Sequence, residues 1–381
     1  MKLMKKGKKF FSAIILLVLL AAVNGCTNSG TYDSNDDILP YEANYHQDTI
    51  EYGRFTDYSV IIGETTAFPL NGILSMPNNT AQPVPAAVIV HGSGGHDMDG
   101  NMFGNAPYRD MAEYLAANGV AVIRHDKRNF AHGAALVAEF GGDFTVWEES
   151  IEDALFAAAL LRTDPRIDPN RIFLIGHSLG AMLAPRIQIA AQEREIEFAG
   201  LILMAGTPRE FTVVALEQFD ASLTAGRMML ETLEGEALAA GEAEIAAAQA
   251  QTDFLIEIAD MIWETPAENL KEMFFMGGSF YYIHDLASPS FEEAVADVHV
   301  PMLVMQGGKD FQVLADVDFV MLQDILSGRT NVTFKLYEGL NHLFMPTTAT
   351  NFLEHRNKMM QSPETVYTQV LRDVVVWIFA Q

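Results

Sequence analysis

The feature that most constrains the fold of this chain is a regular alternation of short apolar segments with longer segments of helical spacing. Apolar runs of strand length lie at residues 86–90, 120–123, 172–175 and 201–204. Segments with helical spacing separate them, at residues 108–118, 146–162 and from Leu179 onward. Strands that are apolar throughout are buried on both faces, so helices must cover both sides of the sheet. The pattern predicts an α/β fold with a doubly wound, mostly parallel sheet.

Two departures from this alternation predict how the chain is divided. Short strands at residues 58–62 and 70–76 precede it and suggest an antiparallel edge. Between residues 207 and 296 the chain becomes rich in Ala, Glu, Met and Leu, with helical spacing and no convincing strand. The alternation then resumes, with strands at 301–305 and 332–336 and helices at 316–326 and 365–379. We therefore expect a core in two parts, 51–206 and 297–381, and a helical lid inserted at 207–296.

The N-terminus has the pattern of a secretory signal. Five lysines lie within the first nine residues, and an apolar run of about 14 residues follows, at 10–23, with no acidic residue. This run is shorter than the roughly 20 residues that a membrane-spanning helix needs. Residues 1–25 are therefore predicted to be a signal peptide.

Cys26, the only cysteine in the chain, follows this segment directly. The sequence Val23-Asn24-Gly25-Cys26 resembles the lipobox of bacterial lipoproteins, in which the cysteine is acylated and becomes the mature N-terminus. The alternative is ordinary cleavage that leaves an incidental cysteine. The resemblance implies an exported cell-envelope lipoprotein that faces the extracytoplasmic side, with residues 26–50 as a polar tether to the membrane.

The formal net charge argues against nucleic acid as a partner. It is −26 for the whole chain and becomes −31 without residues 1–25, which hold five lysines and no acids. A surface this acidic repels a phosphate backbone.

A nucleophile is predicted at Ser178. The segment Gly176-His177-Ser178-Leu179-Gly180 follows an apolar strand and opens a helix, which is the context that gives the G-x-S-x-G pattern its meaning. Glycines at both ends permit a sharp, strained turn that lifts the serine hydroxyl clear of the backbone.

An oxyanion hole is predicted beside it. His91-Gly92-Ser93-Gly94-Gly95 comes directly after the strand at 86–90, and small residues let backbone N–H groups approach a developing oxyanion. We assign the donors to the amides of Ser93 and Leu179, with Gly94 as the alternative to Ser93. The segment can also be read as a glycine-rich turn without a catalytic role.

An acid and a base follow the last two predicted strands. Asp310 comes after the strand at 301–305, and His342 comes after the strand at 332–336. His342 is expected to take the proton of Ser178, and Asp310 to orient the imidazole. Glu338 and Asp316 compete for the role of the acid, but Glu338 is too close to His342 in sequence to lie in the preceding loop.

From about residue 55 to 381 the chain resembles the α/β-hydrolase superfamily, specifically bacterial serine esterases that are dienelactone-hydrolase-like or serine-aminopeptidase-like. The matching stretches are 91–95, 124–128, 168–172, 176–180 and 340–342. Dienelactone hydrolases themselves use a cysteine as the nucleophile and haloalkane dehalogenases an aspartate, whereas this chain has Ser178 at that position.

The resemblance implies hydrolysis of a carboxylic ester, in a small molecule or linked to a polymer, through an acyl-enzyme. A serine aminopeptidase or amidase, an acyltransferase, and a non-catalytic scaffold that binds a ligand are the alternatives. We expect no cofactor and no metal, because the histidines lack metal-ligand spacing such as H-E-x-x-H. Asp126, Lys127 and Arg128 are expected to form a structural cluster of ion pairs. The lid is rich in methionine and aromatic residues, and we expect Trp263, Phe274 and Phe275 to line an acyl pocket.

The lipoprotein hypothesis predicts that Cys26→Ser releases the protein from the membrane. Each buried methylene of an acyl chain contributes about 0.8 kcal/mol to membrane binding, so an acylated Cys26 should keep the protein in the membrane fraction. Fractionation of cells that express the two forms tests this, and an unchanged membrane fraction in the variant would remove the hypothesis.

Overall fold

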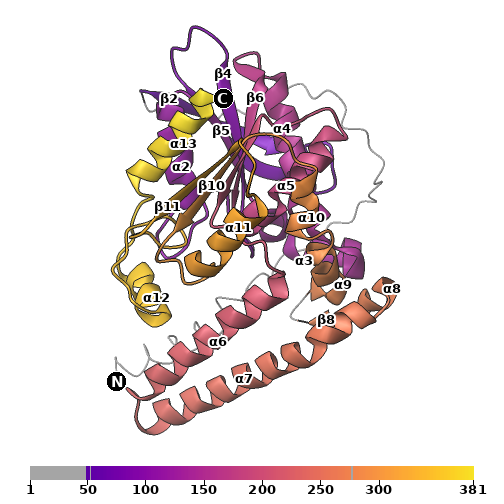
Figure 1. The fold of residues 1–381 in the computed structure, drawn as a ribbon, viewed down its shortest axis with the longest axis vertical. Helices are drawn as coiled ribbons and strands as arrows, with labels where there is room; N and C mark the ends of the chain where they lie inside the picture. Colours follow the sequence, from indigo (N-terminus) through magenta and orange to yellow (C-terminus); the bar gives the residue numbers. More distant parts are fainter. Residues whose placement is uncertain (1–48, 52, 276–277) are drawn as a thin grey trace.

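The computed structural model describes residues 49–51, 53–275 and 278–381. Its main element is a nine-stranded sheet in the order β1-β2-β3-β5-β4-β6-β7-β10-β11 (Figure 1). The first three strands and the β3–β5 pair are antiparallel, and every other pair in the sheet is parallel. The bounds of the strands are β1 Thr49–Glu51, β2 Phe55–Ile62, β3 Leu70–Pro77, β4 Val84–Val90, β5 Ala121–His125, β6 Ile167–His177, β7 Gly200–Met204, β10 Met302–Gly307 and β11 Val332–Tyr337.

Helices cover both faces of this sheet. Two hydrophobic clusters lie on opposite faces of the sheet. In one, the sheet packs against α4, α5 and α10, and in the other it packs against α2 and α13. All residues of β4, β7 and β10 are buried, which explains their continuous apolar sequences. The helices of the core are α2 Pro107–Ala117, α3 Arg128–Phe140, α4 Glu152–Thr163, α5 Leu179–Gln192, α11 Val320–Ile325, α12 Phe352–Gln361 and α13 Thr368–Ala380.

The helix α2 shows how the local sequence specifies an element. Pro107 occupies its first turn, where the missing N–H of proline costs no hydrogen bond. Tyr108, Met111, Ala112 and Leu115 are buried at the three- and four-residue spacing of one helix face. This face packs on the sheet, so α2 directs Tyr108 toward the carboxyl ends of the strands.

The predicted doubly wound α/β fold is correct, and its strand order determines where loops meet. From β4 the chain passes to β5 on one side and then to β6 on the other. The loops that leave the carboxyl ends of β4 and β6 therefore diverge at a topological switch point, where ligands bind in sheets of this kind.

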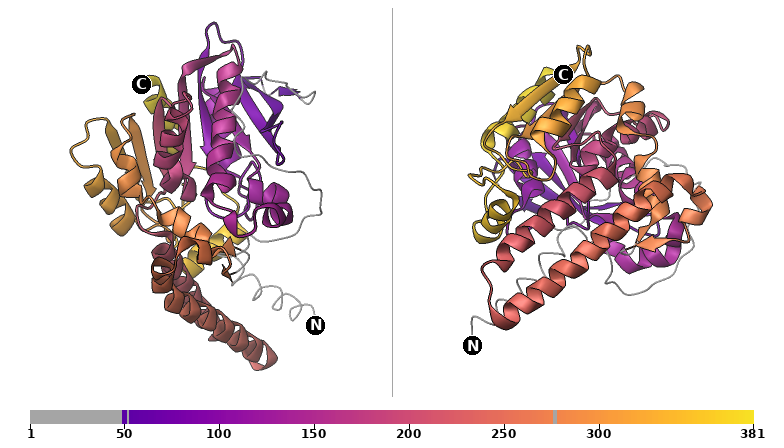
Figure 2. Two further views of the ribbon diagram at one scale, coloured as in Figure 1. Left: turned by 90° about the vertical axis from the view of Figure 1, so that its right-hand side faces the viewer. Right: turned by 60° about the horizontal axis from the view of Figure 1, so that its bottom comes forward.

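The chain between β7 and β10 consists mainly of helices, which we call the insertion (residues 207–296). Its helices are α6 Phe211–Leu230, α7 Gly235–Glu264, α8 Ala267–Leu270, α9 Phe280–Ala287 and α10 Phe291–Ala296. Figure 1 and the right view of Figure 2 show α6 and α7 side by side as a long hairpin that extends from the body of the molecule. In the part of the chain that the structure describes, no helix has both the length and the apolar character required to cross a membrane.

One expectation for this region is wrong, because the insertion is not free of strands. Phe274–Phe275 and Gly278–Ser279 form β8 and β9, an antiparallel pair. Strands of two residues are too short to show the alternation by which a strand is recognised in a sequence.

Candidate active site

Ser178 occupies a strained turn between β6 and α5. Its φ is 55° and its ψ is −116°, a conformation that residues with a side chain rarely adopt. Its backbone N–H donates to the carbonyl of Met204 (2.8 Å), and its carbonyl accepts from the N–H groups of Ala181 and Met182 (3.0 Å each). These bonds fix both peptide units around the serine, so the strained conformation is held from both sides.

The glycines of the G-x-S-x-G segment are required by close backbone contacts. A Cβ atom on Gly176 would lie 2.3 Å from the carbonyl oxygen of Gly180, and one on Gly180 would lie 2.3 Å from the carbonyl oxygen of Val90. Any side chain here would push α5 away from β4 and β6. The two glycines therefore allow Ser178 to approach the loop after β4.

That loop, which we call the His91 loop (residues 91–96), lies directly beside the nucleophile. A Cβ atom on Gly92 would lie 3.2 Å from the Cβ of Ser178. Ser93, the predicted oxyanion donor in this loop, is exposed. Leu179, the other predicted donor, is the first residue of α5, where helix N–H groups lack intrahelical partners and attract negative charge.

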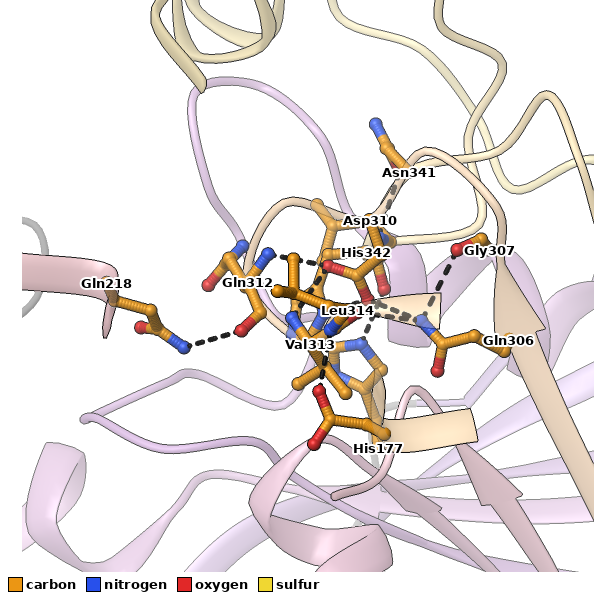
Figure 3. Close-up of polar contacts among 12 residues, drawn as sticks. His177, Gln218, Gln306, Gly307, Asp310, Gln312, Val313, Leu314, Asn341 and His342 are labelled. Atoms are coloured by element: carbon orange, nitrogen blue, oxygen red, sulfur yellow. Dashed lines mark hydrogen bonds and ion pairs between the residues drawn. The ribbon is translucent and has the colours of Figure 1, made fainter. Parts of the chain in front are cut away.

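His342 and Asp310 form a buried pair. His342 Nδ1 lies 2.7 Å from Asp310 Oδ2, and both residues are 4% exposed. Figure 3 shows this contact together with the amide of Gln306, whose Nε2 donates to the same carboxylate oxygen (2.9 Å). The other oxygen accepts from the backbone N–H groups of Gln312 (2.8 Å) and Val313 (3.0 Å).

These partners keep Asp310 ionised. Burial by itself would raise the pKa of this carboxyl, but the His342 imidazole and the backbone donors outweigh it and lower the pKa below its usual range. Glu338 and Asp316, the competing acids, are both exposed. Asp310 is therefore the carboxylate that contacts His342.

A hydrogen-bonded chain that the sequence did not indicate joins the His342 segment to the His91 loop. The N–H of Gly92 donates to Tyr108 Oη (3.1 Å), which leaves the Tyr108 hydroxyl to donate to His177 Nδ1 (3.1 Å). His177 Nε2 then donates to the carbonyl of His342 (2.9 Å). Burial, and to a smaller extent the neighbouring His342, lower the pKa of His177 to about 3. The imidazole of His177 therefore stays neutral in this hydrogen-bonded chain.

Asn341 organises the loop that carries His342, the predicted base. Its side-chain oxygen accepts from the backbone N–H groups of Leu343 (2.9 Å) and Met345 (3.0 Å). Asn341 and Gln306 both lie in segments that contain a predicted site residue, but neither role could be recognised without the fold. Tyr108 lies far from those segments in the sequence and carried no signal.

The expected ion-pair cluster after β5 is confirmed for two of its three members. Lys127 Nζ lies 3.0 Å from Glu149 Oε1, and Arg128 pairs with Asp153 and Glu152. The expectation for Asp126 is wrong, because its carboxylate accepts the backbone N–H of Met98 (2.9 Å) and makes no ion pair with a described residue. Short polar side chains next to a turn often bind backbone N–H groups in this way.

The insertion borders the loop that carries Asp310 (residues 308–314), which we call the acid loop. Gln218 of α6 donates from Nε2 to the carbonyl of Gln312 (3.1 Å), a contact drawn in Figure 3. A pocket of about 400 Å³ lies between them. Residues that line it are Leu216, Glu217, Gln218, Asp220, Ala221, Phe311, Gln312 and Leu314.

The structure places the remaining predicted residues as follows. Trp263, near the end of α7, packs its ring against His284 and is 44% exposed. Phe274 in β8 is 52% exposed, and the side chain of Phe275 lies outside what the structure describes. Cys26 lies outside the described residues, as do the predicted signal peptide and most of the tether. The acyl-pocket role of the three aromatic residues stays a prediction.

Comparisons with known proteins agree on the fold family. The model described as "Alpha/beta hydrolase family" matches residues 87–354. Esterase EstD of Thermotoga maritima is 31% identical over 282 residues, which make up 74% of this chain and 60% of that protein, so the chain spans about three fifths of this curated relative.

Two solved structures with low sequence identity are also similar. Est1E from Butyrivibrio proteoclasticus is 17% identical, with 85% of this chain and 99% of that chain covered and a TM-score of 0.49. Acetyl xylan esterase 1 from Thermoanaerobacterium sp. is 13% identical, with 93% and 92% covered and a TM-score of 0.48.

Burial of His355 predicts that the folded protein loses stability in mild acid. His355 of α12 is 3% exposed, and burial lowers its pKa to about 4 from the ordinary value of 6.5. Between these values the unfolded chain binds more protons than the folded protein, so stability present above pH 6.5 is lost as the pH falls toward 4.

Replacing His355 by leucine should remove its share of this pH dependence. The drop in the free energy of unfolding from pH 7 to pH 5 should be smaller in His355→Leu by about 2 kcal/mol, as measured by urea denaturation. His299→Leu, at an exposed position, is the control. Identical pH dependence in the wild type and His355→Leu would contradict the prediction.

Proposed function

This chain belongs to the α/β-hydrolase family, and from that premise we propose that it is a carboxylic ester hydrolase with Ser178, His342 and Asp310 as its catalytic triad. The observation that carries the proposal is the buried contact between His342 Nδ1 and Asp310 Oδ2, at the same sheet edge as a serine on a strained turn. The name of its relative EstD, an esterase, supports ester hydrolysis.

The proposed reaction begins at Ser178. Its Oγ attacks the ester carbonyl carbon while its proton passes to His342 Nε2, and the carbonyl oxygen becomes an oxyanion. Asp310 holds the Nδ1–H tautomer of His342 and stabilises the imidazolium. When the tetrahedral intermediate collapses, His342 gives the proton to the departing alcohol and the acyl-enzyme remains. Water activated by His342 then attacks this ester, and Ser178 recovers its proton as the acid leaves.

The oxyanion is proposed to bind the backbone N–H groups of Leu179 and Ser93, with Gly94 as the alternative to Ser93. The start of α5 supports the first assignment, because a helix N-terminus stabilises negative charge. The close approach of Gly92 to Ser178 supports the second, because the amide of Ser93 is the next one along the chain. Donors of this kind lower the barrier because they are aligned before the charge develops.

The insertion is proposed to act as a lid that selects the ester. Its first residues are anchored beside the acid loop: Arg209 binds Asp318 through Nε (2.7 Å) and Nη2 (3.0 Å), and Thr207 Oγ1 donates to the same carboxylate (2.7 Å). The pocket between α6 and the acid loop offers space for part of a small or medium-sized ester. Trp263, Phe274 and Phe275 are proposed to contact the acyl chain.

We also propose that the protein is exported and anchored to the cell-envelope membrane through an acylated Cys26. The lysines before the apolar run and the lipobox-like sequence before the cysteine support this. The ester substrate would then be met outside the cytoplasm.

A substrate screen tests the reaction class. The purified mature protein should hydrolyse chromogenic esters of short to medium acyl length faster than aminoacyl anilides. Faster cleavage of the anilides would identify an amidase, and turnover that appears only with an added alcohol acceptor would identify an acyltransferase. Absence of Ser178-dependent turnover on every substrate would favour a non-catalytic scaffold.

Substitution of the triad should give non-additive losses. Ser178→Ala and His342→Ala should each lower kcat by about 10⁴- to 10⁶-fold, and the double variant should lose hardly more. Asp310→Asn should cost on the order of 10⁴-fold, because an amide selects the wrong tautomer of His342. Glu338→Gln, at an exposed position, should retain wild-type kcat on the same ester. The reverse result for Asp310 and Glu338 would show that the acid is wrongly assigned.

Shortening single aromatic side chains of the insertion should change the acyl length that the enzyme prefers. Trp263→Ala, Phe274→Ala or Phe275→Ala should shift the ester length with the highest kcat/KM, because each methylene that fits an apolar wall contributes about 1 kcal/mol. The reaction of Ser178 with a small phosphonate should stay unchanged. A uniform loss on all esters, together with a lower Tm, would show that these residues only hold the insertion together.

A further inference from the structure

We propose that Lys127, held by Glu149 and Tyr282, is a positioning residue that orients the Ser93 amide for the oxyanion. The inference rests on the proposed esterase function and extends it to residues outside the triad.

Lys127 binds the His91 loop at both of its ends. Its Nζ donates to the carbonyl oxygen of Gly92 (2.8 Å), and its backbone N–H donates to the carbonyl oxygen of His96 (2.9 Å). The side chain is 2% exposed. One buried residue thus sets the position of a loop that otherwise contains three glycines.

The bond to Gly92 controls a single peptide unit. The carbonyl of Gly92 and the N–H of Ser93 belong to the same planar, trans peptide group, so they point in opposite directions. Lys127 holds the carbonyl end, and this fixes the direction of the Ser93 N–H. The preceding peptide unit is held as well, because the N–H of Gly92 donates to Tyr108 Oη. The ammonium charge further polarises the peptide and strengthens its N–H as a donor.

A buried ammonium group needs a fixed counterion, and the structure provides one. Glu149 Oε1 lies 3.0 Å from Lys127 Nζ and also accepts from Asn129 Nδ2 (2.9 Å). Glu149 Oε2 accepts from the hydroxyl of Tyr282 (2.5 Å). Burial, and next the charge of Glu149, raise the pKa of Tyr282 well above its usual value, so this hydroxyl keeps its proton and remains a donor.

Tyr282 belongs to α9, so the network also reaches the insertion. The order of contacts is Tyr282, Glu149, Lys127 and the carbonyl of Gly92. A buried ion pair is weak evidence for stability, because the loss of hydration offsets much of the attraction. The ion pair of Lys127 and Glu149 contacts the His91 loop on one side and the insertion on the other, and these contacts point to a role in orientation.

The matched experiment compares two buried ion pairs that are adjacent in sequence. Lys127→Met/Glu149→Gln removes the donor to Gly92 and leaves no unpaired charge. Arg128→Met/Asp153→Asn removes the neighbouring buried pair, and Glu152, the second partner of Arg128, has a side chain that is 12% exposed and keeps its contact with solvent. Loss of one oxyanion donor typically costs about 10²- to 10³-fold in kcat, so misalignment should cost about 10- to 100-fold. We expect this loss in the first double variant with unchanged KM, and wild-type kcat in the second.

A trifluoromethyl ketone separates positioning from general loss of structure. It forms a hemiketal oxyanion with Ser178, so its inhibition constant should rise by the same factor as kcat/KM falls. Both double variants should have a lower Tm, and all assays are made well below it. Wild-type kcat in the Lys127 variant, or an equal loss in the Arg128 variant, would overturn the proposal.

A milder variant keeps the proposal testable if the first does not fold. Tyr282→Phe removes one hydroxyl from the network, and Tyr281→Phe on the same helix is its control. Tyr282→Phe should lower kcat several-fold at unchanged KM, and equal kcat in the two variants would refute the network. If the wild type shows no Ser178-dependent ester hydrolysis, the proposed function and this inference are both wrong. If the wild type is active and the Lys127 and Tyr282 variants keep its kcat, the inference alone is wrong.

Discussion

A non-glycine residue with a left-handed backbone, Ser178, is the constraint on which the architecture of the site depends. Its conformation is unfavourable in isolation and persists only because its N–H, its carbonyl and the flanking glycines are all engaged by β4, β7 and α5. The ends of β4 and β6 are already adjacent through their parallel pairing, with Val90 opposite Gly176. The close contacts of the two glycines let the loops that follow these strands approach each other.

Around this turn, the site is organised by backbone groups that are held by hydrogen bonds. Ser178, Gly92 and His342 each accept or donate a backbone hydrogen bond to a buried partner, and three of those partners are side chains: Lys127, Tyr108 and His177. Buried polar groups are costly when unpaired, so such a network tolerates few alternative arrangements. Rigidity is what electrostatic catalysis requires, because donors that must reorient during the reaction stabilise charge less.

The sequence predicted the parts of this protein that local chemistry determines. The apolar runs of β4, β6, β7 and β10 predicted the sheet, and the G-x-S-x-G segment predicted the strained turn at Ser178, because strand burial and turn geometry are encoded within a few residues. Asp310 and His342 could be selected because each follows a strand of the same sheet. Tyr108, Gln306 and Lys127 could not be assigned, since their roles depend on neighbours from distant segments. The sequence predicts an ion pair for Lys127, but its bond to Gly92 depends on the fold. The strands β8 and β9 are too short to show any period.

The length of the α6–α7 hairpin has a mechanical consequence. At 1.5 Å per residue, the 30 residues of α7 span about 45 Å. A rotation of about 10° at one end of a helix of that length displaces the other end by roughly 8 Å, which is more than one helical turn. The hairpin is held at its base by the contact of Arg209 with Asp318, and its far end extends from the body of the molecule. Asp318 also accepts the backbone N–H of Leu314, so the base of the hairpin and the end of the loop that carries Asp310 share one carboxylate.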